Sequence, residues 1–385
     1  AVVARLLARR HGARAGGMTP VKIGDATIHH GDVRAVLATL TSESVQTVVT
    51  SPPYWGLRDY GVEGQIGLEA TPEEFIATMV AVFSEVRRVL RSDGTCWINI
   101  GDSYAGSWGA QSRGGAPSKS STLQGNGHVG GGPKVNALSA VQVAAAPKTT
   151  GTGSMSRTPQ CKPKDLVGIP WMLAFALRAD GWYLRQDIIW HKPNPMPESV
   201  RDRCTKAHEY IFLLTKSERY HYDIDAIKER SSENTHARLP GNRSHKGTTA
   251  YEEGAGEHRT KAGLVAYAER KRAESGSGTK NNASFDEAMA VMPDTRNKRS
   301  VWTVASEPFS GAHFATFPTK LIEPCILAGA APGDVVLDPF HGAGTTGMVA
   351  LSHGRQYVGI ELNADYIAMS VPRLESAGAQ GRLFA

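Results

Sequence analysis

Short apolar runs alternate with stretches of helical periodicity along most of the chain. Runs rich in β-branched and aromatic residues predict strands near positions 27, 46, 96, 184, 210, 335 and 357. Apolar residues at helical spacing predict helices over 33–40, from 72 to about 92–94, and over 164–180, 319–329, 345–353 and 364–374. This alternation of strands and helices is typical of an α/β fold.

Two long segments interrupt the pattern. Residues 105–163 are dominated by Gly, Ser, Thr, Gln and Ala, with almost no acid, which predicts a flexible insertion. Residues 228–300 are highly charged and contain few large apolar side chains, so they predict a small variable domain or extended loops. We also expect a disordered extension over 1–25 and a short tail over 376–385.

Composition narrows the class of protein only slightly. The 385 residues carry a net charge of +6, which permits a polyanionic partner without proving one. The four cysteines show no CxxC pair and no metal-ligand spacing, so we expect free thiols in a reducing cytoplasm and no metal site. No apolar run approaches the roughly 18–20 residues of a membrane helix.

The stretch TSPPYW directly follows the apolar run near position 46. Its two prolines, Pro52 and Pro53, end the strand, because neither donates a ladder hydrogen bond. A stiff loop is therefore expected at the carboxyl end of a strand, where open α/β sheets bind ligands. It offers the Ser51 hydroxyl and the rings of Tyr54 and Trp55, which suit a flat polar ring with an amino group. A simple proline-rich turn remains the alternative for these residues alone.

The stretch DPFHGAGTTG, residues 338–347, lies between a predicted strand and a predicted helix. Its glycines let backbone N–H groups approach a ligand at the helix N-terminus. No lysine follows Gly344, which disfavours a nucleotide-hydrolysing P-loop. Glu361 ends the next strand about twenty residues later, where an acid is placed to bind both ribose hydroxyls of a nucleoside cofactor.

Together these stretches resemble the S-adenosylmethionine-dependent DNA amino-methyltransferases in the circularly permuted arrangement called class β. The resemblance covers roughly 26–101, 164–226 and 300–375. Its motifs, in chain order, are TSPPYW, QDIIWHKPNP with KAHEYIFLLTK, HFATFPTKLIEPCI, VVLDPFHGAGTT and YVGIE.

The resemblance implies a Rossmann-like fold with a circularly permuted chain order. Its seven-stranded, mostly parallel sheet has one antiparallel strand, and we assign the antiparallel hairpin to the strands near 184 and 210. The catalytic half would occupy 26–104 and 164–227, around the insertion. A target-recognition region would occupy 228–300, and the cofactor half 301–375.

S-adenosylmethionine is the cofactor that the resemblance implies. Asp338 and the turn Gly342–Gly344 would hold its methionine part, Glu361 its ribose, and Asp32 its adenine amino group. For Asp32, a helix N-cap is the alternative interpretation. The complete set of predicted cofactor residues is Asp32, Phe317, Lys320, Asp338, Phe340, Gly342, Gly344, Thr345 and Glu361.

The same resemblance assigns catalysis to Ser51, Pro52, Pro53 and Tyr54. The exocyclic amino group of a flipped base would donate to the Ser51 hydroxyl and the Pro52 carbonyl, then attack the methyl group directly while the base stacks on Tyr54. Serine at the first position is typical of N4-cytosine enzymes, while Asp or Asn is typical of N6-adenine enzymes. N6-adenine therefore stays open, and RNA or protein amide methylation is a more distant alternative.

Double-stranded DNA is the expected partner. Basic residues of the 228–300 segment would neutralise phosphates, although a solvated charged face is the alternative for each of them. A homodimer and a cognate restriction endonuclease are further expected partners, for a bacterial or phage-encoded protein of the cytoplasm associated with the nucleoid. The candidate DNA contacts are Trp55, Lys192, Arg270, Lys271, Arg272, Arg296, Lys298 and Arg299.

Overall fold

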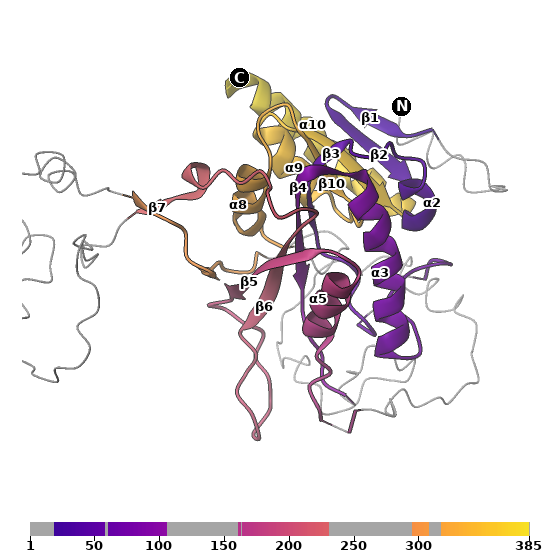
Figure 1. Ribbon diagram of the computed structural model, residues 1–385, viewed down its shortest axis with the longest axis vertical. Helices are drawn as coiled ribbons and strands as arrows, with labels where there is room; N and C mark the ends of the chain where they lie inside the picture. Colours follow the sequence, from indigo (N-terminus) through magenta and orange to yellow (C-terminus); the bar gives the residue numbers. More distant parts are fainter. Residues whose placement is uncertain are drawn as a thin grey trace, which may run out of the picture. The chain divides into compact units, whose positions relative to one another are not determined.

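The computed structural model describes residues 19–57, 61–105, 161–162, 164–230, 295–307 and 317–384 (Figure 1). The chain divides into two compact units, one formed by Ala1–Tyr222 with Ser300–Ala385 and the other by Asp223–Arg299. Most of the predicted insertion, and the predicted DNA contacts Arg270, Lys271 and Arg272, lie outside the described residues. The recognition role of the 228–300 segment stays a prediction.

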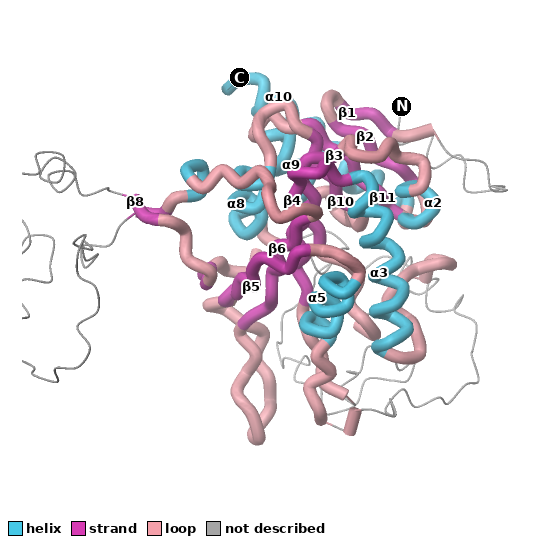
Figure 2. Tube along the Cα trace, viewed as in Figure 1, coloured by secondary structure: helices cyan, strands magenta, loops and turns pink. Residues whose placement is uncertain are grey.

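A mixed sheet forms the centre of the first unit (Figure 2). Within the described residues, its nine strands follow the order β1 (Val21–Ile23), β2 (Ala26–His30), β11 (Gln356–Glu361), β10 (Val335–Asp338), β3 (Val45–Thr50), β4 (Leu90–Ile100), β6 (His208–Thr215), β5 (Tyr183–His191), β9 (Val301–Thr303). β1 and β6 run antiparallel to their neighbours, and the other strands are parallel to one another.

All seven predicted strands are present, and β5 and β6 form the predicted antiparallel pair. The prediction was nevertheless wrong in the number of strands, because β1 and β9 extend the sheet at its two edges. It was also wrong in expecting one antiparallel strand, since β1 is a second. Each added strand has only three residues, which is too short to show a periodic pattern.

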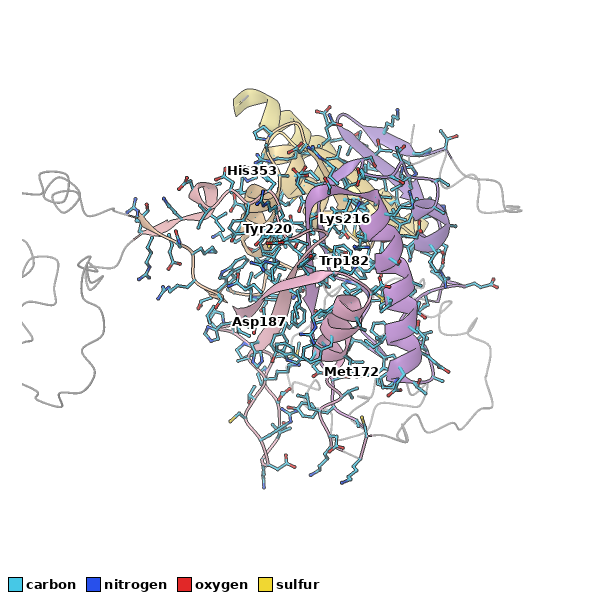
Figure 3. All side chains as sticks on the ribbon, viewed as in Figure 1. Met172, Trp182, Asp187, Lys216, Tyr220 and His353 are labelled. Atoms are coloured by element: carbon cyan, nitrogen blue, oxygen red, sulfur yellow. The ribbon has the colours of Figure 1, made fainter. Side chains whose placement is uncertain are left out.

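Helices cover both faces of the sheet (Figure 1). One face carries α2 (Val33–Leu37), α3 (Pro72–Val89) and α5 (Ile169–Ala179), and the other carries α8 (Thr319–Gly329), α9 (Thr345–Ser352) and α10 (Ala364–Phe384). Apolar side chains of α3 and α5 fill the space above β3, β4 and β6, together with the buried Trp182 that Figure 3 labels. This burial is the main stabilising term for the arrangement.

Four helix boundaries differ from the predictions by several residues. α2 ends at Leu37 and not at 40, and α5 begins at Ile169 and not at 164; the ends of α3 and α10 differ as well. α3 begins as expected, because Thr71 and Glu74 form a reciprocal capping box before Pro72. It ends earlier, at Val89, since the following residues already extend β4. α10 continues to Phe384, so most of the predicted tail over 376–385 is helical.

The strand order brings distant parts of the chain to one edge of the sheet. The N-terminal β2 pairs with the C-terminal β11, and β10 pairs with β3. Because these strands are parallel, all of their carboxyl ends meet at the same edge. β6 is antiparallel, so its first residues reach that edge as well. The loops that follow the strands therefore enclose one region.

The second unit contains a short 3-10 helix, η1 (Asp225–Ile227), and the antiparallel strands β7 (Glu229–Arg230) and β8 (Thr295–Arg296). All four cysteines are free, as predicted. Among the described helices, none combines the length and apolar character that crossing a membrane requires.

Candidate active site

A cavity of about 700 Å³ lies at the carboxyl edge of the sheet in the first unit. This volume is typical of a small-molecule site. Both loop motifs contribute to its wall, although they are separated by almost 290 residues of sequence. The predicted residues that line it are Asp32, Ser51, Pro52, Pro53, Tyr54, Lys192, Phe317, Asp338, Phe340, Gly342, Thr345 and Glu361.

Asp338 ends β10 and links the two motifs. Its carboxylate accepts hydrogen bonds from the Thr50 hydroxyl at 2.6 Å, the Phe340 N–H at 3.0 Å and the Thr346 hydroxyl at 2.8 Å. Burial raises the pKa of Asp338 to about 6, although these three donors act in the opposite direction. Because Thr50 directly precedes Ser51, Asp338 holds the glycine turn against the start of the proline loop.

Glu361 ends β11 and faces the same turn. Its two carboxylate oxygens accept from the N–H groups of Gly342 and Asn363, each at 2.8 Å. Burial raises the pKa of Glu361 to about 7, against the effect of these N–H donors. Each oxygen keeps a further lone pair for a ligand. The turn needs glycine at Gly342 and Gly344, whose φ angles are +53° and +79°.

Asp32 follows β2 and caps α2. Its side chain accepts from the N–H groups of Arg34 and Ala35 at 2.9 and 3.2 Å, and the Arg34 guanidinium donates to both of its oxygens. The hydrogen bond from the Arg34 side chain lowers the pKa of Asp32. The N-cap interpretation is therefore confirmed. The carboxylate also lines the cavity, and its contact with adenine stays a prediction.

A hydrogen-bonded network holds Tyr54 on the other side of the cavity. The Tyr54 hydroxyl donates to Glu209 Oε2 at 2.7 Å, and Asn99 Nδ2 donates to the same oxygen at 3.3 Å. The Lys192 ammonium forms an ion pair with Glu209 Oε1 and lies 4.1 Å from the centroid of the Trp190 ring. Burial and the nearby charge of Glu209 both raise the pKa of Tyr54 well above its usual value, so the phenol stays protonated.

A sequence model described as "DNA methylase" matches residues 45–372. This chain belongs to the DNA methylase family. Its type II relatives belong to restriction–modification systems, and the methyl donor of the family is S-adenosylmethionine. The match spans the proline loop, the glycine turn and all but one of the strands that end at the cavity.

Two relatives match the methylase over most of its length. The type II methyltransferase M.Cfr9I of Citrobacter freundii is 43% identical over 358 residues, which cover 92% of this chain and 90% of that protein. M.SmaI of Serratia marcescens is 40% identical over 348 residues, covering 89% of each. A solved structure titled PvuII DNA methyltransferase (cytosine-N4-specific) shares the fold, with a TM-score of 0.53 at 16% identity over 91% of this chain and 87% of that one.

Several predicted site residues of the methylase lie elsewhere. Trp55 is only 4% exposed and donates its indole N–H to the Glu69 carbonyl at 2.9 Å, so its burial disfavours the predicted DNA contact, which stays a prediction. Lys320 is exposed on α8 and does not line the cavity. Gly344, which also does not line it, is the N-cap of α9.

The predicted DNA contacts that are described carry partners within the methylase. The ion pair with Glu209 compensates the charge of Lys192. In the second unit, Arg296 and Arg299 both donate to Glu229, at 2.9 and 2.7 Å. Phosphate binding by either arginine would therefore have to compete with this carboxylate. Their DNA contacts stay predictions, as does that of Lys298.

Sequence reasoning missed Glu209, Asn99 and His341 of the methylase. Glu209 lies within the quoted motif KAHEYIFLLTK, yet nothing local marks an acid at a strand start as part of a site. His341 is buried beneath the glycine turn, where its two ring nitrogens bond to the hydroxyls of Tyr357 and Ser370, each at 2.8 Å. These bonds support the glycine turn from the protein interior. The one sequence signal for a role of His341 was its position within the glycine-rich stretch.

Proposed function

We propose that this methylase transfers a methyl group from S-adenosylmethionine to the exocyclic N4 of a cytosine flipped out of duplex DNA. The observation that carries this proposal is Ser51 at the first position of the proline loop, with both the loop and the glycine turn on the wall of one cavity. Serine is the residue typical of N4-cytosine enzymes at this position.

The cavity wall fits the proposed cofactor. S-adenosylmethionine supplies an electrophilic methyl group on a sulfonium, and it also carries an ammonium and a ribose. Asp32, Asp338 and Glu361 give the wall an acidic character that suits a cation. Glu361 would accept from the ribose hydroxyls, and Asp338 with the turn over Gly342–Gly344 would hold the methionine part of the cofactor. Phe317, Phe340 and Thr345 would complete this side of the site.

The proline loop would prepare the nitrogen for attack. The amino lone pair of cytosine is delocalised into the ring, which makes it a poor nucleophile. Hydrogen bonds from the amino group to Ser51 Oγ and the Pro52 carbonyl favour a more tetrahedral nitrogen with a localised lone pair. The N–C bond then forms as the S–C bond breaks, and the nitrogen loses its surplus proton to solvent. Positioning and charge stabilisation supply most of the rate.

The flipped base would stack on Tyr54, whose hydroxyl Glu209 holds in place. The proline loop precedes the glycine turn in the chain, as in the class β arrangement. From the type II relatives we further infer duplex DNA as substrate, a restriction endonuclease of the same specificity as functional partner, and the bacterial or phage-infected cytoplasm as location. We also propose that the protein forms a homodimer, and light scattering would measure its mass in solution.

One experiment tests the function directly. The gene is expressed in a host that lacks DNA methylation, and the host DNA is sequenced for modified bases, with Ser51→Ala as the matched control. We expect N4-methylcytosine at one short sequence motif and none with the variant. Detection of N6-methyladenine instead would show that the target base is adenine and not cytosine. An unmodified genome, from a protein that binds S-adenosylmethionine by calorimetry, would overturn methylation of DNA.

A further inference from the structure

The loop that joins β5 to β6, residues 192–207, extends beyond the ends of these two strands (Figure 1). It presents an apolar side chain, that of Met196, to solvent. Met196 is 83% exposed, more than any other large apolar residue that the structure describes, and it lines the cavity. Scattered exposed apolar side chains are common on proteins. Met196 differs from these in two respects. It lies beside the cavity that would receive the base, and the loop that carries it is constrained by prolines and by side-chain hydrogen bonds.

Proline restricts the backbone on both sides of Met196. The sequence from Lys192 to Pro197 reads K-P-N-P-M-P, so every second residue is proline. A residue that precedes proline is disfavoured in the α region and stays extended. Lys192, Asn194 and Met196 all precede a proline. The chain therefore has few alternatives to the extended path that displays the Met196 side chain.

Side-chain bonds anchor the loop before and after Met196. On one side, Asn194 Oδ1 accepts from the Ser306 N–H at 3.1 Å and the Ser306 hydroxyl at 3.2 Å, and Asn194 Nδ2 donates to the Ser306 carbonyl at 3.3 Å. On the other side, Glu198 Oε2 accepts from Arg203 at 2.6 Å and from the Lys206 N–H at 3.3 Å. The loop is thus organised before any partner binds, which reduces the entropic cost of binding.

We propose that Met196 inserts into the base stack of duplex DNA and fills the space that the target base vacates when it enters the cavity. The inference rests on the proposed function, in which that base leaves the helix. Proteins that distort DNA commonly insert apolar side chains, methionine among them, between base steps. The unbranched, polarisable thioether adapts to such a gap. Arg201 is exposed on the same loop and suits a neighbouring phosphate.

The test compares two oligonucleotide duplexes under single-turnover conditions. One is fully paired, and in the other the target base lies opposite an abasic site, so it is already unpaired. For Met196→Ala we expect the rate constant on the paired duplex to fall about tenfold, equivalent to about 1.4 kcal/mol. On the second duplex we expect it to change less than about twofold, because less stacking must be broken. Met196→Leu, which keeps an apolar side chain, restores most of the rate on paired DNA.

Leu166→Ala is the matched control. Leu166 is also an exposed aliphatic residue, at 52%, but it does not line the cavity, so its removal leaves both rates unchanged. As a second readout, 2-aminopurine next to the target base gains less fluorescence with Met196→Ala than with the unaltered protein.

Two results would overturn the role of Met196: an equal loss on both duplexes, or no loss on either. Failure of the proposed function is distinguishable from both. In that case Tyr54→Ala would retain methylation of both duplexes, or the unaltered protein would methylate neither.

Discussion

Glu209 offers the sharpest test of how the catalytic loop is held. Its Oε2 is the acceptor for the Tyr54 phenol at 2.7 Å, and its Oε1 pairs with Lys192. A hydrogen bond to a charged group contributes about 1.5–3 kcal/mol, which corresponds to a factor of about 10–150. Glutamine keeps one acceptor oxygen and loses the charge. We therefore expect Glu209→Gln to slow methyl transfer about tenfold, near the lower limit.

A double-mutant cycle with Tyr54→Phe measures the interaction itself. Single-turnover methylation gives the rate constant for each variant, and calorimetry gives the affinity for S-adenosylmethionine. Phenylalanine lacks the hydroxyl that Glu209 binds, so Glu209→Gln should cost little in the Tyr54→Phe background, with a coupling energy of about 1–2 kcal/mol. Cofactor affinity should stay constant in all four proteins, because Glu209 lies on the base side of the cavity.

Lys192→Met controls for the ion pair. It removes the partner of Glu209 Oε1 and leaves the bond from Tyr54 to Oε2 in place. Its effect on the rate should therefore be smaller than that of Glu209→Gln. Strictly additive losses for Glu209→Gln and Tyr54→Phe would refute the positioning of Tyr54 by Glu209.

Further expectations concern the cofactor side and the core. The pKa of Glu361 is about 7, so affinity for S-adenosylmethionine should rise as pH increases to about 7 and then level off. Calorimetry on Glu361→Gln should show weaker affinity with a smaller pH dependence, because Asp338, with a pKa of about 6, still titrates in this range. The free energy of unfolding of the cofactor-free protein should fall as pH rises from 4.5 to about 7, because the folded state binds this proton more tightly; a flat profile in urea titrations would contradict the shift. Thr50→Val removes the 2.6 Å donor to Asp338 and should cost about 1–3 kcal/mol in urea unfolding, whereas Thr50→Ser should cost less. Trp55→Ala should cost about 3–5 kcal/mol of stability and leave the DNA affinity of the folded protein unchanged; a specific loss of DNA binding would show that Trp55 contacts DNA after all.

Local features of the sequence were enough to locate the six α-helices that the structure describes, the seven longer strands of the sheet and the two loops. Strands β5 and β11 lie at the predicted positions, near 184 and 357, because their apolar runs are bounded by polar residues, proline or glycine. Pro52 and Pro53 end β3 by their own covalent geometry, and the glycines after Asp338 permit the positive φ angles of the turn. Each of these signals acts over a few neighbouring residues, which is why it can be read without a structure.

Which strands are neighbours depends on packing over the whole chain, and no local pattern encodes it. The pairing of β2 with β11 brings Asp32 to the same cavity as Glu361, and the pairing of β10 with β3 joins Asp338 to Thr50. The antiparallel direction of β6 places its second residue, Glu209, at the edge where the parallel strands end. The orientation of the Trp55 ring was equally undetermined, because a loop has no periodicity to separate an inward from an outward side chain. The sequence by itself thus determined the two loops of the site, and the tertiary structure decided which side chains complete it.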